Sequence, residues 1–190
     1  MKQLVVVIMV MLFANANAQS YQLQKEGSSI TVLQNDAKTI VSNNTDAASV
    51  MDYQQKIYFI SKDGDGAIKA YDVNTKKTTD VVSVGMKSET GYVVKSVVNM
   101  IPDTKGGKIY FTTKDVYRGN VQYMTWRYDI STKAYDVYCD GKALSLSPDN
   151  VLEVMFTGKD MNGQYEQKAY FNASYRQLIK QDDKVYSAVK

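Results

Sequence analysis

The sequence predicts an all-β protein, and more specifically a small β-propeller of four blades closed by its N- and C-terminal strands. Three observations support this fold class: short runs of β-forming residues between turn residues, strands that are apolar on both faces, and an internal repeat of about 45 to 50 residues. No segment after Tyr21 has the 3.6-residue periodicity of an amphipathic helix. A β-sandwich or open stacked sheets are the alternatives with the same strand content.

The predicted strands are runs rich in Val, Ile, Tyr and Thr that alternate with Gly, Asn, Asp and Ser. Within residues 56–60, Ile57 and Phe59 share one face, and Tyr58 and Ile60 share the other. A two-layer sandwich leaves one face in water, so a strand that is apolar on both faces indicates a sheet between two others. The clearest runs are residues 30–34, 39–42, 56–61, 68–72, 80–84, 108–113, 121–129, 135–139, 151–157 and 164–171. Asp140-Gly141 and Asn162-Gly163 predict hairpin turns.

An internal repeat is the most specific feature. The letters FISKD at residues 59–63 recur as FTTKD at 111–115 and as FTGKD at 156–160. Downstream, YDVNTK at 71–76 matches YDISTK at 128–133, and the third copy has only YFN at 170–172. Each copy is expected to form one four-stranded blade, and together they cover about residues 47–181. The remaining segments, 21–43 and 184–189, are expected to pair as the fourth blade and leave no open ring edge.

The start of the chain predicts export. Residues 1–18 have a lysine at position 2, an apolar run from 4 to 13 and small residues up to Ala18, which is typical of a secretory signal peptide. The run is shorter than the roughly 20 residues that span a bilayer, and no later run is apolar enough to be expected to cross a membrane. The single cysteine, Cys139, lies far from the cut, so no lipid anchor is expected there. We therefore expect a periplasmic or secreted protein, with residues 19–190 as a single all-β domain.

The composition excludes several kinds of chemistry. The chain has no histidine and one cysteine, which excludes Ser-His-Asp and Cys-His catalysis, imidazole metal ligands and an internal disulfide. Its net charge of +3 is small and its lysines are dispersed, so a nucleic-acid partner is not expected. We expect no cofactor and no metal site, and we expect the Cys139 thiol to be buried and inert.

Residues 144–156, LSLSPDNVLEVMF, resemble the Ser-Pro-Asp-Gly-Lys…Phe-x-Ser consensus of the periplasmic propeller repeats found in TolB-type proteins. Ile101-Pro102-Asp103, followed by residues 108–111, is a looser copy. The motif is structural, because proline presets φ for a turn and aspartate accepts the hydrogen bonds of the turn. TolB-type propellers usually have more blades than four. A homodimer that pairs two half-rings is therefore an alternative to a single closed ring. The resemblance implies a binding or scaffolding role in the cell envelope.

Two groups of residues are candidate binding surfaces. The first is a polar rim on one face of the propeller, formed by the Lys-Asp pairs of the repeat: Lys62, Asp63, Lys114, Asp115, Lys159 and Asp160. The second is the densest aromatic-basic cluster: Tyr117, Arg118, Tyr123 and Trp126. The plain interpretations are turn chemistry with a solvated charge for the rim, and packing between blades for Trp126.

The sequence therefore predicts a non-catalytic binding module whose partner is a protein or glycan of the cell envelope. One alternative is a carboxylate-dependent carbohydrate-active or other hydrolase, for which Glu153, Asp160 and Glu166 are neighbouring carboxylates. The other is an assembly subunit that pairs through edge strands. An enzyme requires carboxylates that converge in a pocket. A binding module requires an exposed aromatic or charged surface, and an assembly subunit requires unpaired strand edges.

Overall fold

The computed structural model describes residues 20–63 and 66–187, with the backbone alone for residues 46–48. These residues form sixteen strands and no helix, as the all-β prediction requires. The predicted signal peptide, residues 1–18, lies outside the described residues.

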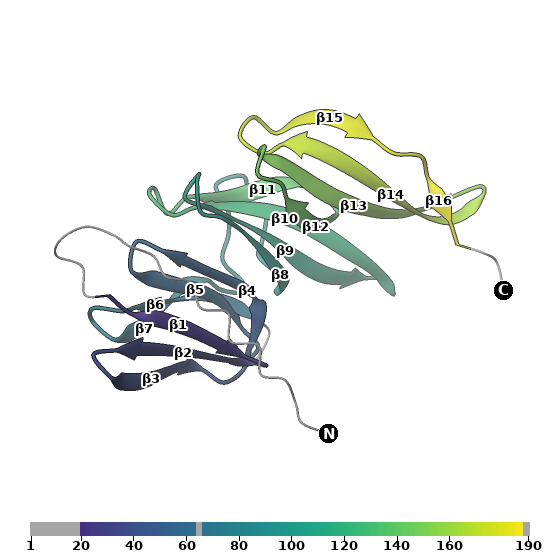
Figure 1. Ribbon diagram of the computed structural model, residues 1–190. Coiled ribbons are helices and arrows are strands. Elements are labelled where there is room, and N and C mark those ends of the chain that lie inside the picture. Colours follow the sequence, from purple (N-terminus) through teal and green to yellow (C-terminus); the bar gives the residue numbers. More distant parts are fainter. Residues whose placement is uncertain (1–19, 64–65, 188–190) are drawn as a thin grey trace, which may run out of the picture.

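The strands form four antiparallel sheets that follow one another along the chain (Figure 1). The first sheet contains β1 (Gln22–Glu26), β2 (Ser29–Gln34) and β3 (Ala37–Ser42), and the second contains β4 (Thr45–Tyr53), β5 (Lys56–Ser61), β6 (Ala67–Asp72) and β7 (Lys77–Val82). The third sheet contains β8 (Ser96–Asp103), β9 (Lys108–Tyr117), β10 (Asn120–Asp129) and β11 (Tyr135–Asp140). The fourth contains β12 (Lys142–Leu146), β13 (Val151–Asp160), β14 (Gly163–Asn172), β15 (Gln177–Gln181) and the short β16 (Val185–Tyr186).

The three sequence repeats are the second, third and fourth sheets, and the same turn joins the last two long strands of each. The side chains of Asp72, Asp129 and Asn172 accept hydrogen bonds of 2.8–3.2 Å from the backbone N–H groups two and three residues further on. The residue four places on has positive φ in each turn: Lys76 at 56°, Lys133 at 60° and Arg176 at 57°. The weak third copy therefore forms the same turn, because asparagine keeps the acceptor oxygen that aspartate supplies.

The sheets stack face to face, with apolar side chains between them. In β5, Ile57 and Phe59 pack with residues of the first sheet, whereas Tyr58 and Ile60 pack with residues of the third. This confirms the prediction that strand 56–60 lies between two sheets. The buried side chains between the second and third sheets include Met51, Met100, Phe111 and Trp126, and those between the third and fourth sheets include Tyr110, Tyr138, Leu152 and Val154.

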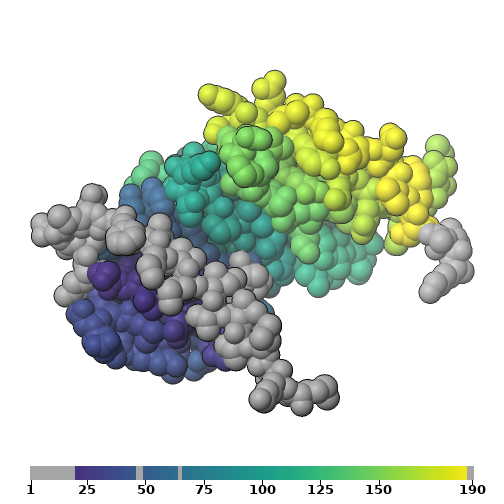
Figure 2. All heavy atoms as spheres, in the orientation of Figure 1, coloured from purple at the N-terminus to yellow at the C-terminus, as the bar shows by residue number. Residues whose placement is uncertain are grey.

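The prediction of a ring closed by the two ends of the chain is wrong. β16 pairs with β14, through Tyr165 opposite Tyr186 and Glu166 opposite Val185, and not with residues 21–34. The first and fourth sheets lie at opposite ends of the stack, as the colours of Figures 1 and 2 show. The N-terminal segment does form three strands as expected. The architecture is therefore propeller-like but open, as in the stacked-sheet alternative.

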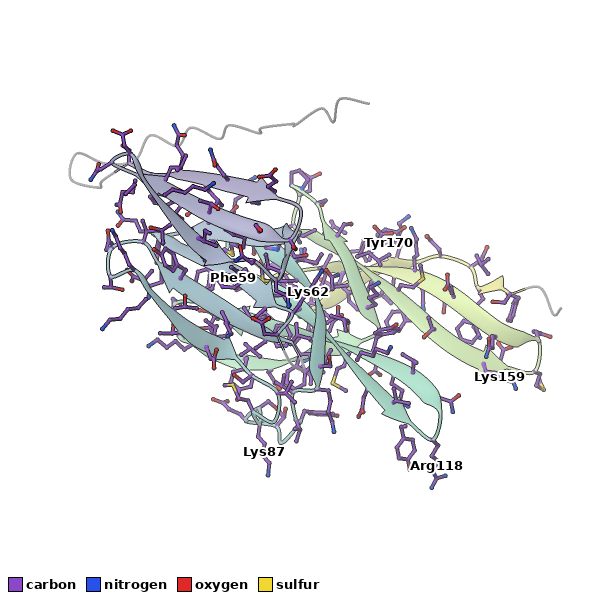
Figure 3. All side chains as sticks on the ribbon, turned by 90° about the horizontal axis from the view of Figure 1, so that it is seen from below. Phe59, Lys62, Lys87, Arg118, Lys159 and Tyr170 are labelled. Carbon is purple, nitrogen blue, oxygen red and sulfur yellow. The ribbon has the colours of Figure 1, made fainter. Side chains whose placement is uncertain are left out.

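The outer face of the fourth sheet is polar, which explains how the stack can end there. Glu153 accepts a hydrogen bond of 2.9 Å from the Ser145 hydroxyl and forms an ion pair of 2.7 Å with Lys168. The Tyr170 hydroxyl, labelled in Figure 3, donates to Asp182 at 3.0 Å. A face with its polar groups paired in this way is compatible with water, so no further sheet is needed to cover it.

Candidate functional site

The hairpins β9–β10 and β13–β14 extend beyond the stacked sheets. Each of their strands has ten residues, whereas β5 and β6 have six each. Along β9, residues 109–113 are buried and residues 114–117 are exposed. Figure 3 shows Arg118 and Lys159 at the ends of the two hairpins, away from Phe59 among the stacked strands. We call residues 114–123 and 157–166 the two hairpin arms.

A groove of about 660 Å³ lies where the arms leave the stack, at the edge of β10. One wall is the loop between β7 and β8, with Tyr92 and Val93. The opposite wall is the fourth sheet, with Phe156 and Tyr165. The floor is formed by residues 121–124 of β10. The groove therefore runs between the third and fourth sheets, and its lining combines apolar and aromatic side chains with polar and charged ones.

The groove exists because β11 ends early. It pairs with β10 only as far as Met124 opposite Asp140. Gly141 then turns the chain into the fourth sheet with φ of +91°, and a Cβ atom there would lie 2.6 Å from the carbonyl oxygen of Met155. Asp140-Gly141 is thus a turn between two sheets rather than the predicted hairpin, while Asn162-Gly163 does join β13 to β14. Only glycine suits this close approach.

Charged groups lie beside the aromatic walls. Lys95 and Asp115 form an ion pair of 3.7 Å, with both side chains about half exposed. The Asp115 carboxylate also accepts a hydrogen bond of 2.8 Å from the Val116 N–H. Asp140 is exposed and, within the described part of the chain, belongs to no ion pair. The groove thus combines apolar walls with one carboxylate that is open to a basic partner.

The three Lys-Asp pairs of the predicted rim lie just after β5, within β9 and at the end of β13, and each aspartate has its own local partners. Asp63 accepts a hydrogen bond of 2.8 Å from the Asn44 amide. Asp160 accepts a hydrogen bond of 2.7 Å from Lys184, which lowers the pKa of its carboxyl group. Among the described residues, no hydrogen bond or ion pair joins one Lys-Asp pair to another, and only Asp115 of the six lines the groove.

The structure divides the predicted aromatic-basic cluster. Trp126 is fully buried between the second and third sheets, and its Nε1 donates a hydrogen bond of 2.9 Å to the Thr113 hydroxyl. Tyr117 and Arg118 lie at the exposed end of their arm, with the guanidinium carbon 5.1 Å from the centre of the tyrosine ring. Tyr123 lines the groove. Trp126 is therefore a core residue, in agreement with the interpretation that it packs between blades.

Sequence reasoning did not identify the walls of the groove. Tyr92 is half exposed in a loop that a bridge between Lys87 and Val93 folds back. Phe156 and Tyr165 were expected only as strand residues. These side chains come together through the stacking of separate sheets, which no local pattern encodes. The one available signal was hairpin length, because the strand patterns on both sides of Asn162-Gly163 are long.

The carboxylates considered for a hydrolase do not converge. Glu153 lies on the outer face of the fourth sheet beside Lys168, Asp160 lies at the end of an arm, and Glu166 is exposed on β14. None of these three carboxylates lines the groove.

Three further findings concern single residues and small groups. Within residues 20–63 and 66–187, no three His, Cys, Asp or Glu side chains are grouped so that they could hold a metal ion. The same residues contain no helix with the length and apolarity to cross a bilayer. Cys139 is half buried, and burial raises the pKa of its thiol to about 12, so the thiol is protonated at neutral pH.

Comparisons with known proteins bear on the fold. No family model and no curated protein sequence matches the chain. It is similar in structure to the β-propeller domain of the Trilobed protease from Pyrococcus furiosus, described as having an open velcro topology, with a TM-score of 0.53 and 10% identity over 89% of this chain and 54% of that chain. This likeness shows a β-propeller fold.

Two other solved structures have lower scores. TolB from Acinetobacter baumannii has a TM-score of 0.47 and 15% identity over 79% of this chain and 36% of that chain. Hydrazine synthase of Kuenenia stuttgartiensis has a TM-score of 0.48 and 9% identity over 88% of this chain and 46% of that chain. The chain spans about half, or less, of the length of these three solved chains.

Proposed function

We propose that this chain is a non-catalytic interaction module of the cell envelope, periplasmic or secreted, that binds a protein or glycan partner in the groove between its hairpin arms. The observation that carries the proposal is the exposed apolar surface at this end of the molecule. Val116 is 60% exposed, Tyr117 56%, Tyr92 50% and Val121 42%. Soluble proteins rarely gather apolar side chains on one surface region unless a partner covers them.

The chemistry of the groove fits such a partner. Tyr92, Tyr123 and Tyr165 each combine an apolar ring with a hydroxyl that can donate or accept a hydrogen bond. Tyrosine is enriched at protein interfaces for this reason, and aromatic faces also stack on sugar rings. One groove wall belongs to the fourth sheet, and the other is the β7–β8 loop, which backbone hydrogen bonds from Gly85 to Val94 and from Ser88 to Tyr92 hold in place. Little conformational entropy is therefore lost when a partner binds.

The test is capture of partners from the envelope fraction of the source cells by three tagged proteins. They are the wild type, the groove variant Tyr92→Ser with Tyr123→Ser, and the control Tyr175→Ser, which removes a tyrosine that is 80% exposed in the β14–β15 turn. We expect wild type and control to retain the same partner, and the groove variant to retain at least tenfold less, since each lost aromatic contact costs roughly 1–2 kcal/mol. Equal retention by all three proteins would contradict the groove as the site.

The proposed location rests on the sequence features of residues 1–18 and on the TolB-type turn motif. Cell fractionation followed by N-terminal sequencing tests it. We expect a mature protein that begins at Gln19 and is released with the periplasm or the medium. A protein that keeps Met1 and stays in the cytoplasm would overturn this location.

The open stack also supports the assembly alternative, including a homodimer of two half-rings. The first and fourth sheets each cover a neighbour on one side only, so their outer faces and outer strand edges are available to a second chain. Sedimentation over a hundredfold range of concentration distinguishes the cases. A monomer mass throughout the range would contradict self-assembly and leave the groove proposal intact.

A further inference from the structure

The floor of the groove is an unpaired strand edge. β10 pairs with β9 over residues 120–129, but β11 pairs with β10 only from Met124 onward. The Gly141 N–H donates a hydrogen bond of 2.9 Å to the Tyr123 carbonyl from the β11 side. Because the backbone groups of an antiparallel strand alternate, the N–H and C=O of Val121 point to that same side. No described strand lies beside them, so both groups face the groove.

This edge lacks the protection that the outer edges of the other sheets have. Residues 120–123 read Asn-Val-Gln-Tyr and carry no charge. Proteins usually guard exposed strand edges with charged side chains. The outermost strands have such residues, with Lys38 in β3, Lys77 in β7 and Lys180 in β15. The uncharged edge at 120–123 is therefore suited to pairing with another strand.

The groove walls lie on the two faces of this edge. Asp115, paired with Lys95, shares one face of the third sheet with Met124, and Tyr92 lies on this side. Phe156 of the fourth sheet lies on the other side. A strand laid along β10 would direct alternate side chains to the two walls, because successive residues of a strand point to opposite faces.

We propose that the partner bound here is a protein whose extended segment adds to β10 at residues 120–123 as a further strand. This inference rests on the proposed function and names its ligand class. The added strand continues the ladder that β11 leaves at Met124 and pairs its backbone with Val121. Its side chains toward the walls are apolar, and one basic side chain faces Asp140, the exposed groove carboxylate without an ion pair among the described residues.

The test uses linear twelve-residue peptides selected from a phage-displayed random library on the immobilised wild-type protein and then synthesised as probes. We expect selected peptides with apolar residues at alternating positions and one lysine or arginine. Val121→Pro removes the N–H that faces the groove, and proline is tolerated on an edge strand. Ile40→Pro is the matched control, since Ile40 is an exposed β-branched residue of the edge strand β3 and does not line the groove. Thermal unfolding establishes that both variants fold.

Each outcome decides between the proposals. Strand addition predicts a peptide Kd at least tenfold weaker for Val121→Pro, a change of at least 1.4 kcal/mol, and within twofold of wild type for Ile40→Pro. If Val121→Pro binds normally while Tyr92→Ser with Tyr123→Ser does not, strand addition is overturned and the groove function stands. If neither variant alters binding, both proposals are overturned. If Val121→Pro weakens the binding of none of the selected peptides, the strand-addition proposal also fails.

Discussion

The two halves of the β9–β10 hairpin belong to one continuous hydrogen-bonded ladder but have different surroundings. In the half away from the hairpin turn, Phe111 and Trp126 lie opposite each other and are fully buried between sheets. In the arm, Val116 and Val121 are also opposite each other and are exposed. The pairing of β9 with β10 continues through both halves, but only the first half is flanked by β8 and β11 and covered by neighbouring sheets, which makes it core. The arm lies outside the neighbouring sheets, so its exposed side chains can contact a partner.

The largest effect is expected from truncation of the buried half. Trp126→Ala should lower the free energy of unfolding by about 3–5 kcal/mol, because it leaves a cavity and removes the donor to Thr113. Tyr117→Ala, a matched aromatic truncation in the arm, should change it by less than about 0.5 kcal/mol. Urea denaturation followed by far-UV circular dichroism measures both. Trp126→Phe gives an intermediate value if Trp126→Ala does not fold. Equal losses at 117 and 126 would contradict the division between the two halves.

A smaller effect is expected where a buried hydroxyl joins two sheets. The Tyr110 hydroxyl donates a hydrogen bond of 2.9 Å to the carbonyl of Ala173 in the fourth sheet. Tyr110→Phe leaves that carbonyl without this donor and should cost about 1–3 kcal/mol. Tyr117→Phe in the arm serves as the control and should be neutral. A neutral Tyr110→Phe would show that the third and fourth sheets do not depend on this bond.

The smallest effect concerns the turn that the repeats share. The Ser131 hydroxyl and the backbone N–H groups of the turn lower the pKa of Asp129, and the Thr75 N–H lowers the pKa of Asp72. Because the pKa in the folded state is below the usual 3.8, this stabilisation is complete above that value and is lost as the pH falls through the lowered pKa.

Asp129→Ala should therefore cost about 1 kcal/mol at neutral pH, and the difference from wild type should shrink as the pH falls below 3.8 and through the lowered pKa of Asp129. Urea titrations at several pH values measure it. Asp129→Asn is the control, because Asn172 performs the same role in the fourth sheet, so this variant should keep most of the stability at neutral pH. A difference that grows on acidification would refute the assignment.

The sequence was sufficient to predict the strands, the repeats and the faces of the central strands. Residues 56–60 are informative because an alternating pattern fixes which side chains share a face, and apolar residues on both faces require two covering sheets. The turn residues were equally informative, because Asp72 and Asp129 supply an acceptor that the turn geometry needs.

The sequence did not predict that the ring is open, and it did not predict which residues form the walls of the groove. A two-residue strand such as β16 carries no pattern that selects β14 over β1, so its pairing depends on the shape of the whole stack. Tyr92 of the β7–β8 loop and Tyr165 of β14 meet at one groove although they lie far apart in the sequence. Trp126 was compatible with an interface anchor and with packing between blades, because a tryptophan within a strand is typical of both, and the stacking of the sheets makes it a core residue.

In the proposed complex, the uncharged edge of β10 receives a strand from the partner. Amide hydrogen exchange at Val121, measured by NMR with and without a saturating selected peptide, tests it most directly, with Gln122 as the internal control because its amide points to β9. The account predicts that exchange at Val121 slows at least tenfold in the complex while Gln122 changes little. Unchanged exchange at Val121 with the peptide bound would contradict it.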